Sequence, residues 1–202
     1  MKMPIKILFL HGFFASGSCV PAQALRHSLE GKAQVFSPDL PLHPDEALDF
    51  IRHICHKEHP TVIVGNSNGA FLAQMVASEY GMPALLGNPH LEMTEFLNCR
   101  RGTHQYKSPR ADGRQELVID QMLIDEFAVL QQHQWDRCSE QNRDRVWGLF
   151  GEKDTLAHYE PLFLEHYTRS FHFPGVHTPT AEEVEQYYAP LAMKLADEFG
   201  GE

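Results

Sequence analysis

The chain alternates short apolar runs with longer amphipathic stretches. The apolar runs predict strands at residues 5–10, 34–37, 61–64, 84–86, 146–150 and 170–173. The amphipathic stretches predict helices at residues 21–30, 45–56, 68–80, 159–167 and 181–199. Strands and helices that alternate in this way form a parallel sheet with helices on both faces. The run Thr-Val-Ile-Val at 61–64 is β-branched throughout, as expected of a central strand that is buried on both sides.

The alternation lapses between His90 and Arg143, where acidic, basic and apolar residues mix. Only residues 117–132 in this stretch have a helical pattern. We therefore expect residues 1–202 to form one α/β domain, into which residues 90–143 are inserted as a partly helical lid over the sheet.

Composition and charge narrow the class of protein. Of the 202 residues, 43% are hydrophobic and 22% are charged, which is typical of a globular protein. The net charge of -10 would repel nucleic acid and anionic lipid, so we expect neither as a partner. No apolar run approaches the roughly 18 residues of a membrane span. A small-molecule substrate fits this composition better.

The N-terminus begins with lysines ahead of an apolar run, as a secretory signal does. The apolar run before His11 is shorter than the about 7 to 15 residues of a signal peptide, so we expect a first strand instead. The cysteines are widely spaced and form no Cys-x-x-Cys pair, which favours free thiols in a reduced, cytoplasmic protein. They are Cys19, Cys55, Cys99 and Cys138.

Three histidines recur at every third residue, at His53, His56 and His59. Steps of three drift around a helix, and no carboxylate stands at the His-Glu-x-x-His spacing of a zinc site. Pro60 then ends the segment. We expect a solvated helix end there, no metal site, and no cofactor.

The sequence Gly65-Asn66-Ser67-Asn68-Gly69 joins the buried strand at 61–64 to the following helix. A Gly-x-Ser-x-Gly turn at that position holds a serine in a strained geometry that exposes its hydroxyl. The flanking glycines let the strand and the helix approach without Cβ clashes. This pattern predicts Ser67 as a nucleophile, the alternative being an ordinary tight turn between strand and helix.

His11-Gly12-Phe13 directly follows the first strand. In hydrolases with a Gly-x-Ser-x-Gly turn, one backbone N–H of an oxyanion hole comes from this loop and the other from the residue after the serine. The predicted donors are therefore the amides of Phe13 and Asn68. We expect His11 itself to be structural, bonded to nearby backbone.

Two late strands are each followed by a candidate partner for Ser67. Asp154 comes after residues 146–150, and His177 comes after the strand that ends at Phe173. Nucleophile, acid and base follow in the order of this class, and both partners lie at the carboxyl ends of strands. His177 would take the serine proton, and Asp154 would hold the imidazole in the right tautomer.

Alternatives to these two partners exist. His177 would otherwise be an exposed loop histidine, and Asp154 a turn-forming residue that bonds its own backbone. Other carboxylates would take the place of Asp154 if the acid came from a neighbouring position or from the insertion. They are Glu152, Asp125 and Asp144.

Together these motifs resemble the YqiA-like family of small bacterial α/β-hydrolase esterases. The resemblance also draws on Pro38-Asp39-Leu40-Pro41, Gly87-Asn88-Pro89 and the late loops Gly-Glu-Lys-Asp and Gly-Val-His. It implies an α/β-hydrolase fold and hydrolysis of carboxylic esters or thioesters by Ser67, Asp154 and His177. This chain has Ala70 and Val176 where members of the family usually carry glycine.

We therefore expect a serine esterase or thioesterase that acts through an acyl-enzyme on Ser67. The same triad would also serve an acyltransferase, a lactonase or a peptidase. A hydrolase-like protein that binds a ligand without turnover is the remaining alternative.

The charge of the insertion adds a hypothesis about the substrate. Residues 98–115 contain five cations and one acid, a net charge of +4, so the rest of the chain carries -14. A cationic segment above an acidic body would admit an anionic substrate group, with Arg100 and Arg101 as the residues to test. The alternative is a solvated lid surface. The charged residues are Arg100, Arg101, Lys107, Arg110, Asp112 and Arg114.

Overall fold

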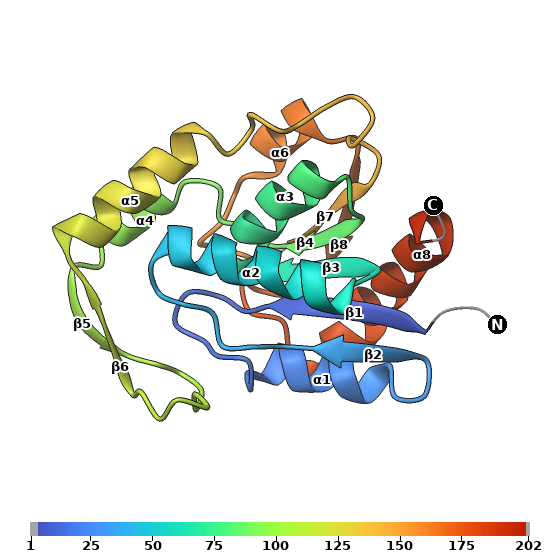
Figure 1. Ribbon diagram of the computed structural model, residues 1–202, viewed down its shortest axis with the longest axis horizontal. Helices are drawn as coiled ribbons and strands as arrows, with labels where there is room; N and C mark the ends of the chain where they lie inside the picture. The colour runs from blue at the N-terminus through green and yellow to red at the C-terminus, as the bar shows by residue number, and fades with distance from the viewer. Residues whose placement is uncertain (1–3, 201–202) are drawn as a thin grey trace.

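Six parallel strands form the central sheet of the computed structural model, which describes residues 4–200 (Figure 1). The strands are β1 (Ile5–Leu10), β2 (Ala33–Phe36), β3 (Val62–Asn66), β4 (Ala84–Gly87), β7 (Val146–Gly151) and β8 (Arg169–Phe173). They lie in the order β2-β1-β3-β4-β7-β8, and every neighbouring pair is parallel. The sequence pattern predicted each of these strands, with small differences at their ends.

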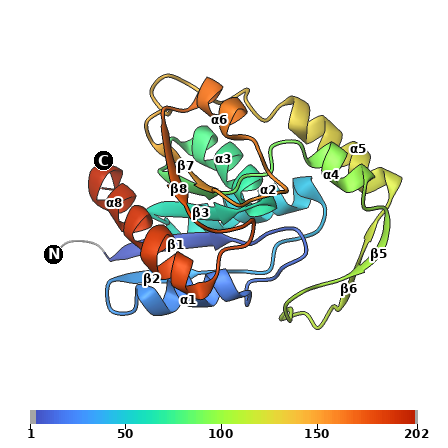
Figure 2. The same ribbon diagram turned by 180° about the vertical axis from the view of Figure 1, so that it is seen from behind.

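Helices cover both faces of the sheet (Figures 1 and 2). One face carries α2 (Pro44–Glu58), α3 (Asn68–Tyr80) and α6 (Glu160–His166). The other carries α1 (Val20–Ser28) and the C-terminal helical segment, which consists of α7 (Ala181–Glu183), a π-helical turn η1 (Val184–Tyr188) and α8 (Ala189–Phe199).

The C-terminal segment differs from the uninterrupted helix predicted over 181–199. Its middle is the π-helical turn η1, which ends just before Pro190. Proline has no N–H to donate to the carbonyl four residues earlier, so the regular α-helical ladder is broken at this point.

Alternate residues of the strands point into two separate cores. In β1, Leu8 and Leu10 pack with α2 and α3, whereas Ile7 and Phe9 pack with α1 and α8. All four side chains are buried, as expected of a parallel strand covered on both faces. This layered packing fixes the positions of the strand ends that carry the candidate site.

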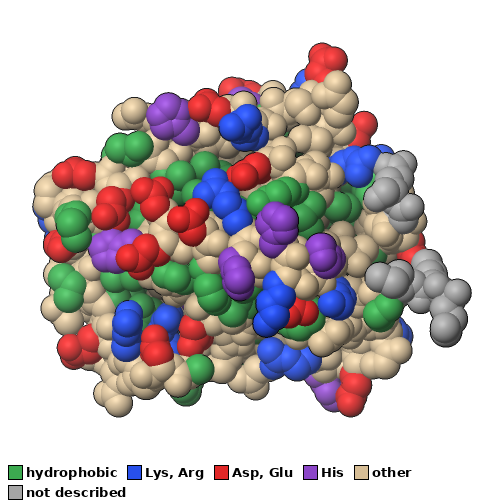
Figure 3. Space-filling view, viewed as in Figure 1, with side chains coloured by type: hydrophobic (Ala, Val, Ile, Leu, Met, Phe, Trp, Pro, Cys, Tyr) green, Lys and Arg blue, Asp and Glu red, His purple; other side chains and the backbone are tan. Residues whose placement is uncertain are grey.

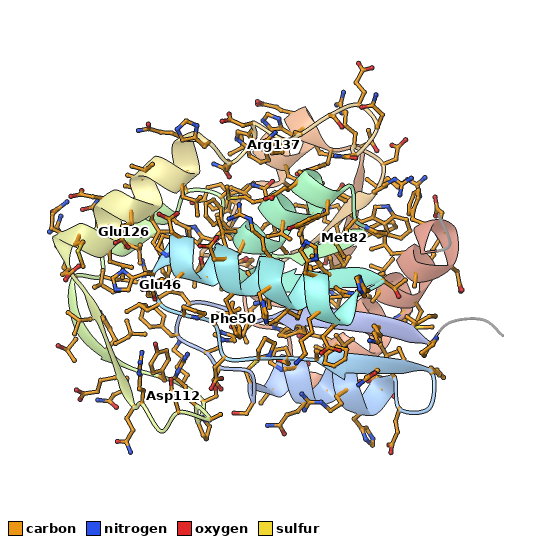
Figure 4. All side chains as sticks on the ribbon, viewed as in Figure 1. Glu46, Phe50, Met82, Asp112, Glu126 and Arg137 are labelled. Carbon is orange, nitrogen blue, oxygen red and sulfur yellow. The ribbon has the colours of Figure 1, made fainter. Side chains whose placement is uncertain are left out.

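Residues 90–143 form α4 (Met93–Asn98), an antiparallel hairpin of β5 (Gly102–Gln105) and β6 (Glu116–Ile119), and α5 (Gln121–Gln132). The hairpin runs from α4 and α5 down one end of the molecule toward α1 and β2 (Figures 1 and 2). Figure 4 shows Asp112 at its tip, far from Glu126 on α5. Neither the hairpin nor α4 was predicted from the sequence.

The helix predicted over 117–132 is wrong at its start, because residues 117–119 belong to β6. Leu117 and Ile119 are buried while Val118 is exposed, which is the alternation of a strand. The helix begins only after Asp120, whose carboxylate accepts a hydrogen bond from the backbone N–H of Leu123 at 2.9 Å.

Candidate active site

Ser67 stands at the sharp turn between β3 and α3. Its backbone has φ 55° and ψ -119°, a strained combination for a residue with a side chain. Gly65 and Gly69 make the turn possible: a Cβ on Gly65 would overlap the backbone of Ala70, and a Cβ on Gly69 would overlap the carbonyl of Leu10. The predicted Gly-x-Ser-x-Gly turn, or elbow, at residues 65–69 is therefore present. The hydroxyl of Ser67 is directed away from the sheet core toward His177.

Three side chains from separate loops meet at this turn. Nε2 of His177 lies 2.8 Å from Oγ of Ser67, and Nδ1 of His177 lies 2.8 Å from Oδ2 of Asp154. Asp154 follows β7, and His177 follows β8. The structure thus brings together the three residues that the sequence suggested as a triad.

Asp154 is buried, and both oxygens of its carboxylate accept hydrogen bonds. Oδ1 accepts the backbone N–H groups of Leu156 at 2.7 Å and of Ala157 at 3.3 Å. Burial raises the pKa of Asp154, but the hydrogen bonds from His177 and Leu156 outweigh it, and the pKa lies below its ordinary value. An ionised Asp154 accepts a hydrogen bond from the N–H at Nδ1 of His177, which leaves Nε2 free to accept the hydroxyl proton of Ser67.

The other carboxylates considered from the sequence lie elsewhere. Glu152 is exposed. Asp125 accepts a hydrogen bond from Gln121 on the exposed side of α5, and Asp144 accepts one from Thr168. Asp154 is the carboxylate that is bonded to His177.

The loop after β1 lies against Ser67. A Cβ built on Gly12 would be 3.5 Å from Cβ of Ser67, so the Gly12-Phe13 backbone passes directly beside the elbow. Asn68 is the first residue of α3, where backbone N–H groups have no acceptor within the helix. The amides of Phe13 and Asn68 therefore belong to the two segments that flank the hydroxyl.

His11 is built into this loop as a structural residue. Its Nδ1 is 2.9 Å from the carbonyl of Gly12, and its Nε2 accepts the backbone N–H of Leu40 at 2.9 Å. Burial lowers the pKa of His11 to about 4, so the ring is neutral and Nδ1 donates to Gly12. This agrees with the structural role expected from the sequence.

Asn88 joins the two loops that carry Asp154 and His177, a role that the sequence analysis missed. Its Oδ1 accepts the N–H of Gly151 at 2.7 Å, and its Nδ2 donates to the carbonyls of Val176 and His177 at 3.0 and 2.9 Å. Asn88 itself has a positive φ of 41°. The one available signal was an Asn-Pro pair directly after a strand, which marks an unusual turn but does not show its partners.

The backbone conformation and exposure of Val176 explain why the loop of His177 tolerates this residue in place of glycine. Val176 is not among the residues with positive φ, and its side chain is exposed. The space is tighter one position earlier, where a Cβ on Gly175 would overlap the side chains of Phe173 and Glu183 unless they moved. The carbonyl of Gly175 in turn accepts the N–H of Lys153 at 2.9 Å, which ties the two loops together.

His90 is a second residue of the site that no sequence motif predicted. It is buried beside the triad, with its ring 6.4 Å from that of His177 and 4.6 Å from that of Phe96. Its Nδ1 has no hydrogen-bond partner among the described residues. Burial, together with the nearby His177, lowers the pKa of His90 to about 4, so this ring is neutral at neutral pH.

A cleft of about 540 Å³ opens at Ser67 and His177. Its floor comes from the elbow and the loop after β1, and its rim from α4, the hairpin tip and the loop after Asp154. The lining includes Phe13, Phe14, Val20, Ser67, Phe96, Arg100, Lys107, Ser108, Pro109, Leu156 and His177. A larger cavity of about 1090 Å³ lies between α1, β2 and the hairpin tip, but neither Ser67 nor His177 lines it. We assign the site to the smaller cleft because the reactive groups open into it.

The basic segment 98–115 meets this cleft in part. Arg100 and Lys107 line it. Arg101 does not, because its guanidinium is bonded to Asn98 and Gln121 on the exposed surface. Of the two arginines that the sequence offered for a test of anion binding, Arg100 therefore lines the cleft and Arg101 does not.

Within residues 4–200, no group of three or more His, Cys, Asp or Glu side chains is placed to hold a metal ion. His53 and His56 are exposed on α2. The four cysteines are free thiols. No helix in the described part of the chain has the length and hydropathy to cross a bilayer.

Solved structures with this architecture define the class. Est1E from Butyrivibrio proteoclasticus is 16% identical, with a TM-score of 0.69 over 96% of this chain and 88% of that one. A monoacylglycerol lipase from Paleococcus ferrophilus is 15% identical, with a TM-score of 0.69 over 95% and 94%. The esterase domain of a Rhodothermus marinus protein is 15% identical, with a TM-score of 0.71 over 100% and 90%. The chain has the α/β-hydrolase fold.

The family follows from the sequence itself. The uncharacterised protein family UPF0227 matches residues 6–170, which is most of the chain and includes Ser67 and Asp154. The chain belongs to this family, which is the YqiA-like family that its motifs resemble.

Proposed function

We propose that this protein is a serine hydrolase that cleaves carboxylic esters or thioesters. The observation that carries the proposal is the chain of two hydrogen bonds from Ser67 through His177 to Asp154, each 2.8 Å long. Nucleophilic catalysis requires that the nucleophile lie within hydrogen-bond distance of the base, and the base within hydrogen-bond distance of the acid that orients it. The similarity in fold to Est1E, a monoacylglycerol lipase and an esterase domain supports the choice of acyl chemistry.

In the proposed reaction, His177 accepts the hydroxyl proton as Oγ of Ser67 attacks the acyl carbonyl. The negative charge that develops on the carbonyl oxygen accepts hydrogen bonds from the amides of Phe13 and Asn68. Collapse of this intermediate breaks the bond to the alcohol or thiol, which leaves with the proton from His177. A water molecule, deprotonated by His177, then cleaves the acyl-enzyme and releases the carboxylic acid and the free serine.

We also propose that residues 90–143 act as a lid. Arg100 from the loop after α4 and residues 107–109 from the hairpin tip line the cleft above Ser67. The hairpin tip is bonded to the loop after β1, since Ser16 and Ser18 both donate to the carbonyl of Pro109. A change in the lid would alter which substrates enter the cleft, but it would not move the residues of the triad.

The proposal predicts stoichiometric labelling by a fluorophosphonate probe and turnover of p-nitrophenyl esters or acyl thioesters. Ser67→Ala should remove the labelling and lower kcat by about 10⁴-fold or more. Ser28→Ala is a matched control, because Ser28 lies on α1 and its hydroxyl bonds the carbonyl of Ala24. Labelling that persists in Ser67→Ala, or folded wild-type protein that is never labelled, would refute the assignment. Labelling with acyl transfer to an alcohol, but no hydrolysis, would point to an acyltransferase.

A further inference from the structure

The charged side chains that line the cleft are cationic. Among the described residues that line it, Arg100 and Lys107 are the permanently charged ones, and no Asp or Glu is present. This is unusual in a chain with 27 acidic and 17 basic residues. Over α2, α3 and α5, by contrast, acidic, basic and histidine side chains are interspersed (Figure 3). A cleft with only cationic charges attracts anions into a site that the protein's net charge would otherwise disfavour.

Arg100 is held beside the cleft with most of its donors unused. Its guanidinium lies 4.0 Å from the ring centre of Phe96, and Nη1 donates to the carbonyl of Phe96 at 3.0 Å. No carboxylate pairs with Arg100 among the described residues. Since a guanidinium has five N–H donors in a planar fork, the remaining ones suit a bidentate oxyanion.

Lys107 approaches the same place from the hairpin. Its backbone N–H donates to the carbonyl of Phe14 at 2.8 Å, and its ammonium lies 5.9 Å from the ring centre of Phe14. The rings of Phe14 and Phe96 are themselves neighbours, with centres 6.1 Å apart. The two cations are therefore placed over one aromatic pair, and no carboxylate in residues 4–200 is paired with Lys107.

Much of the rest of the cleft wall is apolar, and part of that apolar surface is exposed to solvent. Val20 is 58% exposed and Leu156 is 46% exposed, although both are large apolar side chains. Both line the cleft together with the rings of Phe14 and Phe96. Exposed apolar side chains that gather at a concave site indicate a ligand with an apolar part.

We propose that the substrate is amphiphilic: an ester or thioester with an apolar chain and a carboxylate or phosphate that Arg100 and Lys107 bind. This inference rests on the proposed function and specifies the substrate class of the same site. Pairing with these two cations would hold the anionic end at the rim while the acyl carbonyl reaches Ser67. A neutral ester of equal length would gain only the apolar contacts.

The test compares esters matched in length. 4-Nitrophenyl octanoate is the neutral substrate, and the 4-nitrophenyl hemiester of suberic acid carries a carboxylate at the end of the acyl chain. Phenyl octanoates with and without a phosphate on the phenyl ring place the charge on the leaving group instead. The wild type should prefer the anionic member of at least one pair by about 10-fold or more in kcat/KM, with the gain mainly in KM.

The decisive variant is Arg100→Gln combined with Lys107→Gln. It should lower kcat/KM for the preferred anionic ester by about 10-fold or more, and that for the neutral ester far less. Arg101→Gln is the matched control, because it removes a neighbouring positive charge that does not line the cleft. A wild type without anionic preference, an equal loss for both esters in the double variant, or an equal effect of Arg101→Gln would overturn the inference.

A binding measurement separates this inference from the proposed chemistry. Calorimetric titration of Ser67→Ala with the suberic hemiester, which this variant would not cleave, should give a dissociation constant that rises with salt. Adding Arg100→Gln and Lys107→Gln should weaken the binding by about 10-fold. Anion-dependent binding without any wild-type turnover would sink the proposed function alone, and turnover without anion-dependent binding would sink this inference alone.

Discussion

The carboxyl edge of the sheet and the segment 90–143 hold their polar groups in opposite ways. At the sheet edge Asn88 and Asp154 are buried: Asn88 accepts the backbone N–H of Gly151 at the end of β7, and Asp154 accepts those of Leu156 and Ala157 in its own loop. In the segment, the hairpin β5–β6 is mostly exposed, and a few bonds at its tip hold it to the body. Under the proposed function, the sheet edge holds the reacting groups in place, whereas the segment 90–143 selects the substrate.

Glycines test this contrast most strongly. A Cβ on Gly69 would overlap backbone atoms of Leu10 at the end of β1, and these cannot move aside as a flexible side chain would. In the hairpin, Gly113 has a positive φ of 76°, but no atom lies within 4 Å of the place that a Cβ would take. Gly69→Ala should lower the free energy of unfolding by about 3 kcal/mol or more and nearly abolish the proposed ester hydrolysis. Gly113→Ala should cost about 1 kcal/mol, from backbone strain alone.

Urea unfolding and ester hydrolysis, measured on both variants, check this pair. Gly69→Ala with wild-type stability would mean that the elbow yields to the new methyl group. Loss of activity in a stable Gly113→Ala would place part of the rigid machinery in the hairpin. Either result would break the division between the two regions.

The sequence predicted the sheet and the three residues of the candidate triad, for a physical reason. Buried parallel strands are short apolar runs, and the carboxyl ends of such strands meet at one edge. Placing Ser67, Asp154 and His177 after three strands was therefore enough to predict that they meet. Asn88 and His90 also follow a strand, but their importance depends on which backbone groups face Asn88 and which rings surround His90, and no spacing in the chain encodes that.

The hairpin could not be predicted in the same way. The helix α5 and the strand β6 adjoin, and Ile119, Leu123, Phe127 and Leu130 recur at helical spacing, so the apolar pattern of the helix continues back into the strand. Asp120 is the residue that separates the two elements, because its side chain caps α5. The partner strand β5 has little apolar character of its own, since its one partly buried residue is His104.

The pH dependence of stability gives a second, smaller test, at the point where the sheet edge meets the segment 90–143. The pKa of His90 is lowered to about 4 in the folded protein, against an ordinary value near 6.5. The unfolded chain therefore binds a proton that the folded protein does not, and the contribution of this residue to stability is lost as pH falls from about 6.5 toward 4. Between about pH 7.5 and pH 4.5 this loss amounts to about 2 kcal/mol.

His90→Phe removes the titrating group and keeps an aromatic ring against Phe96 and Tyr159. The variant should lose about 2 kcal/mol less than the wild type over that pH range, as measured by urea unfolding at each pH. Because Nδ1 of His90 has no hydrogen-bond partner among the described residues, no hydrogen bond of that atom is sacrificed. An unchanged pH dependence would show that His90 is hydrated or protonated in the folded protein, and that the edge is less tightly closed than its burial suggests.

The smallest predicted effect concerns Asp39, which ties the two regions together. Its Oδ1 accepts the N–H of Gly17 at 2.8 Å, and its Oδ2 accepts the N–H of Ala111 at the hairpin tip at 2.6 Å. Asp39→Asn turns an amide N–H toward one of these donors, so the tip should open more often. Hydrogen exchange at Ala111 should become about 10-fold faster, with little change in global unfolding.

Asp125→Asn is the matched control, because Asp125 accepts from Gln121 on the exposed side of α5 and not from the hairpin tip. Unchanged exchange at Ala111 would mean that the tip is held by the packing of Arg110 over Tyr106, and that the segment is more rigid than the comparison implies.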